Sequence, residues 1–107
     1  MKNLIELKDA LASIENQNGW LYCKKNKELK ENSEVFFYIA DLNLSPDEEK
    51  AVRHGYSTEG FYPYLTKEDI EDVIENLNEQ LEKPSTKDYI NALIFFHEND
   101  AFIECMK

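Results

Sequence analysis

The sequence is poor in the residues that form nucleotide and zinc sites. Its three glycines, Gly19, Gly55 and Gly60, are too few and too scattered to build the glycine-rich loop that cradles a phosphate. The two cysteines, Cys23 and Cys105, match neither a zinc-binding spacing nor a CxxC pair. With no secretory signal in the sequence, we expect both to be reduced thiols. The sequence therefore predicts neither a cofactor nor a structural metal.

Histidine is also scarce, and no catalytic constellation forms around it. His54 and His97 both fall near expected helix ends, where a cationic imidazole interacts favourably with the helix dipole. No motif places a nucleophile and an orienting group beside either ring. The run HEND at 97–100 lacks the spacing of a zinc-binding helix, and residues 41–47 lack the glycine and the terminal glutamate of a calcium loop. We therefore predict that the protein is not an enzyme and binds no metal.

Long hydrophobic runs and basic residues are the remaining absences. The first stretch, MKNLIELKDALASIEN, mixes charges into its apolar positions, so we expect neither a signal peptide nor a membrane span. We therefore expect a cytoplasmic location. Only 12 lysines and arginines oppose 22 acidic residues, for a net charge of −10. Such a chain repels phosphate groups, so we predict no nucleic-acid or anionic-membrane partner. The negative electrostatic field of the chain favours a basic protein partner, unless the acidity serves only to keep the protein soluble.

The composition that remains is typical of a folded protein. Hydrophobic residues make up 42% of the 107 positions and aromatic residues 12%, which is enough for a core. The length is near the commonest domain size, so we expect one domain over residues 1–107.

Periodicity and turn signals predict the elements of this domain. Apolar spacings and capping signals predict four helices, over residues 3–16, 46–54, 67–82 and 87–98, although the last could also be a strand. Short apolar runs between turn formers predict three strands, over residues 20–25, 33–41 and 101–106. Both faces of 33–41 are apolar, which is typical of a central strand. The order αββαααβ predicts an α+β fold in which a small three-stranded sheet is packed by about four helices.

An aromatic segment precedes the third predicted helix. Residues 54–65, HGYSTEGFYPYL, are interrupted by Gly60 and Pro63, so we expect irregular structure there. The segment carries four rings: Tyr56, Phe61, Tyr62 and Tyr64. They either fold onto the sheet or stay accessible as interface anchors, a role in which tyrosine is enriched.

The third predicted helix carries acidic residues on one side. At about 100° per residue, its apolar positions cluster around one direction, and five carboxylates lie about 160° away. These are Glu68, Asp72, Glu75, Glu79 and Glu82. Like charges three or four positions apart destabilise a helix, so a helix selected for stability alone would alternate signs. Either this is an ordinary solvated face, or it combines with the aromatic segment to bind a basic protein.

In size, acidity and α+β layout the chain resembles the small acidic bacterial immunity proteins that neutralise toxin domains, including those of contact-dependent inhibition systems. The C-terminal run ALIFFHENDAFIEC also resembles the ending of a family of small uncharacterised bacterial domains. The first resemblance implies a cytoplasmic, non-enzymatic inhibitor that binds a cognate basic toxin domain, often a nuclease.

Two alternatives stay open at this point. One is a homodimeric regulatory or structural module joined through strand aromatics such as Phe36 and Tyr38. The other is an enzyme or small-ligand binder with a pocket near His54 and His97. The lysine-rich loop at 24–30 is either a separate contact or inert.

Overall fold

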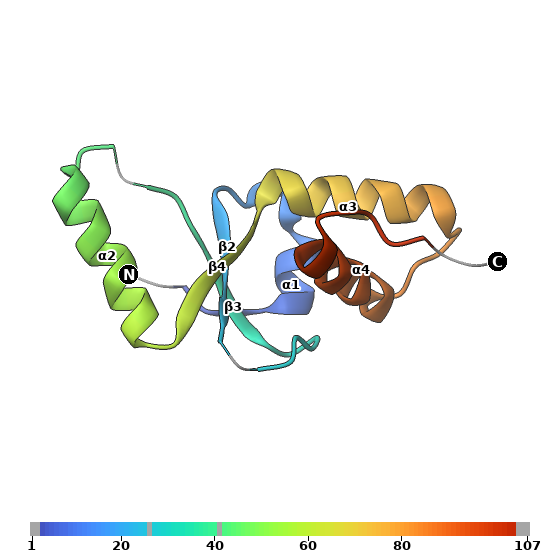
Figure 1. Cartoon of the computed structure of the whole chain (residues 1–107). Coiled ribbons are helices and arrows are strands. Elements are labelled where there is room, and N and C mark those ends of the chain that lie inside the picture. Colours follow the sequence, from blue (N-terminus) through green and yellow to red (C-terminus); the bar gives the residue numbers. More distant parts are fainter. Residues whose placement is uncertain (1–2, 26, 41, 105–107) are drawn as a thin grey trace.

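The computed structural model describes residues 3–25, 27–40 and 42–104. Figure 1 shows the course of the chain, whose described residues form nine elements. They are β1 (Ile5–Glu6), α1 (Leu7–Ala12), the 3-10 turn η1 (Ile14–Asn16), β2 (Trp20–Lys24), β3 (Glu34–Tyr38), α2 (Pro46–Thr58), β4 (Phe61–Thr66), α3 (Lys67–Gln80) and α4 (Thr86–Asn99). The α+β class is confirmed, and the order of elements differs from the prediction.

The strands form one antiparallel sheet in the order β1-β3-β2-β4. The hairpin of β2 and β3 lies at its centre, so the prediction that the second strand is internal is confirmed. Strand β4 pairs with the other side of β2, and the register slips between Leu21, opposite Leu65, and Tyr22, opposite Pro63. Tyr64 is therefore an extra residue in β4, as in a β-bulge.

Several predicted elements and boundaries were wrong. The aromatic segment is irregular only around Gly60, because residues 61–66 form β4, and the sheet has four strands rather than three. Pro63 is tolerated because β4 is an edge strand. Residues 101–104 form no strand, and the rest of the predicted final strand lies outside the described residues. The first helix begins only at Leu7, because Ile5 is paired with Val35 in the sheet.

Each face of the sheet has its own hydrophobic core. Helices α1, α3 and α4 cover one face and α2 lies against the other, as Figure 1 shows. The larger core contains Leu21, Val35, Ile70 and Leu93 with no exposed surface. The smaller one is an aromatic cluster of Tyr22, Phe36 and Phe61, against which Tyr38 and Tyr56 pack. None of the residues of α2 is fully buried, so this helix covers its face of the sheet thinly.

Local signals place the three long helices. Ser45, Thr66 and Ser85 each accept a hydrogen bond from the backbone N–H three residues later, and the acidic side chain there reaches back, which completes three capping boxes. The capping signals that predicted the starts of these three helices are confirmed. Helix α2 continues through Gly55 to Thr58, four residues beyond its predicted end, and the chain then turns at Gly60, whose φ is +92°.

Candidate partner-binding surface

The acidic side of α3 lies where the helical wheel predicted it. Ile70, Val73 and Leu77 are buried against the larger core. On the opposite side five carboxylates are exposed, which we call the acidic face: Glu68, Asp72, Glu75, Glu79 and Glu82. Glu82 lies just beyond the last residue of α3. The tertiary structure therefore leaves all five predicted acidic residues at the surface.

No ion pair between described residues neutralises these carboxylates. Among the residues that the structure describes, the ion pairs join Lys8 to Glu6 and Arg53 to Glu49, and none involves the acidic face. Lys67, the nearest lysine in α3, donates a hydrogen bond from Nζ to the backbone carbonyl of Glu15 at 3.2 Å. The acidic face therefore keeps its negative charge available to a partner.

A shallow groove runs beside the acidic face, between η1 and α3. It has a volume of about 470 Å³ and is lined by Ile14, Glu15, Glu71, Ile74, Glu75, Asn78 and Glu79. Ile14 and Ile74 are only half-buried and give the groove an apolar wall, and four carboxylates border it. We call it the acidic groove. It offers apolar contact next to negative charge, which suits a lysine or arginine side chain with its long aliphatic stem.

The predicted aromatic residues do not join this surface. Phe61 is 3% exposed and Tyr64 is 7% exposed, so neither ring is available to a partner. Tyr56 is half-buried in the cluster beneath α2, and Tyr62 is half-buried near His97 with ring centroids 6.2 Å apart. Successive side chains of a strand point to opposite faces, so β4 divides its rings between the two sides of the sheet. The acidic half of the expected surface is therefore exposed, whereas the aromatic half is enclosed at Phe61 and Tyr64 and only partly accessible at Tyr56 and Tyr62.

The structure gives little support for an enzymatic site at the histidines. His54 lies on α2, and His97 stacks on Tyr64 at 3.9 Å on the other side of the sheet. Burial raises the pKa of the Cys23 thiol to about 12, so it is not ionised at neutral pH. Within the described part of the chain, no three histidine, cysteine or acidic side chains are grouped to hold a metal.

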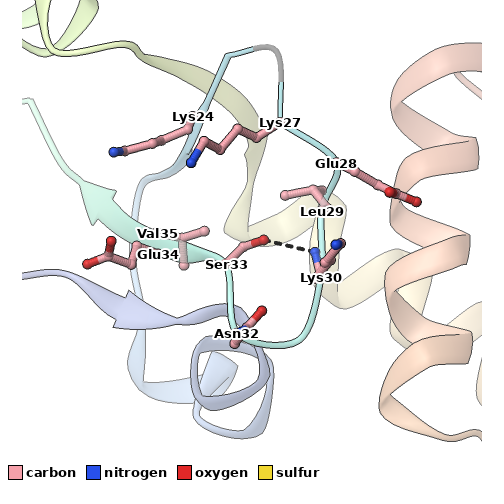
Figure 2. Close-up of a pocket in the computed structure, with 9 residues that line it drawn as sticks. All are labelled: Lys24, Lys27, Glu28, Leu29, Lys30, Asn32, Ser33, Glu34 and Val35. Atoms are coloured by element: carbon pink, nitrogen blue, oxygen red, sulfur yellow. Dashed lines mark hydrogen bonds between the residues drawn. The ribbon is translucent and has the colours of Figure 1, made fainter.

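A second hollow lies under the loop between β2 and β3. Figure 2 shows its lining: Lys24, Lys27, Glu28, Leu29, Lys30, Asn32, Ser33, Glu34 and Val35, around a volume of about 410 Å³. The amines of Lys24 and Lys27 extend to one side and the carboxylate of Glu28 extends to the other. The Lys30 N–H donates to Ser33 Oγ at 2.8 Å, which orders the turn. Because lysines and glutamates alternate around it, this hollow has no single sign of charge.

Exposed apolar side chains of β2 and of the segment after β3 were missed. Trp20, Ile39 and Leu42 are 45%, 60% and 96% exposed. Beside Trp20, a pocket of about 240 Å³ is lined by Trp20, Tyr22, Tyr38, Ala40, Glu49, Arg53 and Pro63. Alternation puts Trp20 and Tyr22 on one face of 20–24 and Phe36 and Tyr38 on one face of 33–41, and this signal, together with the register of the hairpin, could have found the pocket.

The fold and the surface define a small α+β domain with one strongly acidic helical face. The chain belongs to the family described as a domain of unknown function, DUF7716, whose model matches residues 4–105. No curated protein and no solved structure matches the chain. No helix among the described residues has both the length and the apolar character needed to cross a bilayer.

Proposed function

We propose that the protein is an immunity-type inhibitor that binds and neutralises a basic toxin domain, such as a nuclease, in the cytoplasm. It acts without catalysis, by occupying a cationic surface of the toxin. The observation that supports this proposal is the acidic face of α3, which is exposed and makes no ion pair with another described residue.

The charge of the acidic face should speed association with the partner, and the acidic groove should slow dissociation. Complementary charge raises association rates well above those of neutral pairs, and it does so most at low ionic strength. The half-buried Ile14 and Ile74 add apolar area that slows dissociation. A standard interface takes about 800 Å² from each partner. The chain exposes 7295 Å², so one helical face and the groove beside it can supply that area.

The proposal assigns the contact differently from the sequence prediction. Phe61 and Tyr64 are enclosed by the fold, and Tyr56 lies across the sheet from α3. The apolar anchors that remain next to the acidic face are Ile14 and Ile74. We therefore expect truncation of these two isoleucines to weaken binding more than truncation of Tyr56.

Charge reversal tests the proposal directly. The variant changes Glu68, Asp72, Glu75 and Glu79 to lysine. A matched control changes four exposed acidic residues outside the acidic face to lysine: Glu31, Glu34, Glu98 and Glu104. The partner to test is the C-terminal domain of a large secreted protein, where a neighbouring gene encodes one, and the measurement is its dissociation constant at several salt concentrations.

We expect the acidic-face variant to lose most of its affinity and the control, which has the same net charge, to retain it. The affinity of the unmodified protein should fall as salt rises, because exposed charges are screened over about 10 Å at 0.1 M. Equal affinities for the two variants would remove the acidic face from the binding site.

A homodimeric regulatory or structural module remains the second candidate. The exposed Ile39 and Leu42, which lie between β3 and α2 in the chain, favour it, since large exposed apolar side chains often mark contact sites. Phe36, which the sequence suggested for such a contact, is 2% exposed and cannot take part directly. Sedimentation equilibrium decides this: a monomer at all concentrations excludes the dimer.

A further inference from the structure

A pocket opens on the α2 side of the sheet, across the sheet from the acidic groove. Its floor and walls come from four parts of the chain: β2, the end of β3, β4 and the middle of α2. Its volume of about 240 Å³ is lined by Trp20, Tyr22, Tyr38, Ala40, Glu49, Arg53 and Pro63. We call it the aromatic pocket. Residues so distant in sequence meet there only because the sheet has formed.

Three aromatic rings face this pocket. Trp20 and Tyr22 share a face of β2, and Tyr38 lies opposite Trp20 in the register of β3. Tyr22 and Tyr38 meet edge to face, with ring centroids 6.0 Å apart and planes at 84°. Tyr22 is held by the aromatic cluster beneath it, whereas Trp20 is 45% exposed at the mouth of the pocket. The faces of such rings carry partial negative charge and attract cations, tryptophan most strongly.

A carboxylate is held among these rings. Tyr38 donates a hydrogen bond from its hydroxyl to Glu49 Oε2 at 2.5 Å, the short distance of a charge-assisted bond. Burial, and then the hydrogen bond and charge of Glu49, raise the pKa of Tyr38, so its hydroxyl stays protonated and keeps donating. The Glu49 side chain is 16% exposed. The pocket thus contains an oriented negative charge beside three rings.

Arg53 is the one cationic side chain among the described residues that line the pocket, and its ion pair with Glu49 is weak. Its Nε lies 3.5 Å from Glu49 Oε1, one helical turn away, and its side chain is 57% exposed. Ion pairs between residues four apart on a helix contribute little to stability. A second cation can therefore approach Oε1 while Tyr38 keeps its bond to Oε2.

We propose that the aromatic pocket binds one cationic side chain, lysine or arginine, presented by a protein partner. Glu49 supplies the counter-charge and Trp20 covers the aliphatic stem. Charge complementarity selects this occupant, because the chain carries a net charge of −10 and the first turn of α2 adds Asp47 and Glu48 to Glu49. This proposal goes beyond the proposed function, since the pocket and the acidic groove lie on opposite sides of the sheet.

The chain offers a direct reporter for this pocket. Trp20 is its only tryptophan, so its fluorescence reports on the mouth of the pocket alone. The probes are the amides of Nα-acetyl-lysine and Nα-acetyl-arginine, with Nα-acetyl-norleucine amide as the uncharged control of similar shape. All titrations are run at constant ionic strength. We expect a saturable change in Trp20 emission with both cationic probes and none with the norleucine probe.

Two variants that each remove one charge from the pocket should change the affinity for the lysine probe in opposite directions. Glu49→Gln keeps an acceptor for Tyr38 and removes the counter-charge, so lysine-amide binding should weaken roughly fivefold or more. Arg53→Gln removes the competing cation, so binding should tighten by about two- to fivefold. Circular dichroism confirms that each variant is folded, and either variant alone is sufficient for the test.

Two results would overturn the proposal. One is a norleucine response as strong as the lysine response, which would make the pocket merely apolar. The other is no saturable response to either cationic probe up to its solubility limit. Neither result bears on the acidic face, whose charge reversal is tested with the toxin domain and should leave these titrations saturable.

Discussion

The three glycines of this chain form an internal series for measuring backbone strain and steric clash. Gly19 has a φ of +87°, and a Cβ placed there would lie 2.2 Å from the carbonyl oxygen of Tyr38. Gly60 has a φ of +92° with nothing within 4 Å, and Gly55 lies inside α2 with open space around it. Each is changed to alanine in turn.

The expected free energies of unfolding differ in sign as well as size. Gly55→Ala should stabilise the protein by about 0.5–1 kcal/mol, because alanine is the better helix former. Gly60→Ala should cost about 1–2 kcal/mol, the penalty for a side chain in the left-handed region. Gly19→Ala carries the same penalty plus about 1–3 kcal/mol for forcing backbone away at the end of β3. Its total is therefore about 2–5 kcal/mol.

Urea unfolding followed by far-ultraviolet circular dichroism measures all three variants. The midpoints should shift while the slopes stay equal, which shows that stability has changed without a change in the surface exposed on unfolding. Fluorescence is not used because Trp20 adjoins Gly19. The reasoning is refuted if Gly19→Ala costs no more than Gly60→Ala, since the contact with Tyr38 would then have no energetic weight.

Three further predictions follow from the packing and the charges. Leu77→Ala should cost about 2–5 kcal/mol in unfolding free energy, because Leu77 is 1% exposed, whereas Leu42→Ala, at 96% exposure, should change it by less than about 0.5 kcal/mol; equal costs would contradict the core assignment. In a Cys105→Ser background, Cys23 should react with a thiol reagent only as fast as the protein unfolds, and rapid labelling of the folded protein would contradict its burial. The free energy of unfolding should also fall as the pH rises from 9.0 towards about 12, because the Cys23 thiol ionises at lower pH in the unfolded chain than in the folded protein. Glu75→Lys should stabilise the free protein by a few tenths of a kcal/mol, because it relieves repulsion within α3, while weakening partner binding; a loss of stability in urea would show that the acidic face serves the fold.

The surface can be compared with its sequence prediction residue by residue. The acidic face was predicted correctly because it depends only on the 3.6-residue period of α3, with Ile70, Val73 and Leu77 marking the opposite side. Which of the four aromatic rings are enclosed was left open, because the burial of Phe61 and Tyr64 depends on a strand pairing with β2. The acidic groove requires η1 and α3 to lie side by side, a contact that no local pattern contains.

What the amino-acid sequence determined by itself is local. A cap such as Ser45, Thr66 or Ser85 acts on an N–H only three residues away, so its signal and its effect lie within the same short stretch. The tertiary structure decided the rest. Residues 61–66 become a strand, despite Pro63, only because an open edge of β2 is there to pair with them, and a hydrogen-bonding partner some forty residues away is not encoded in the segment itself.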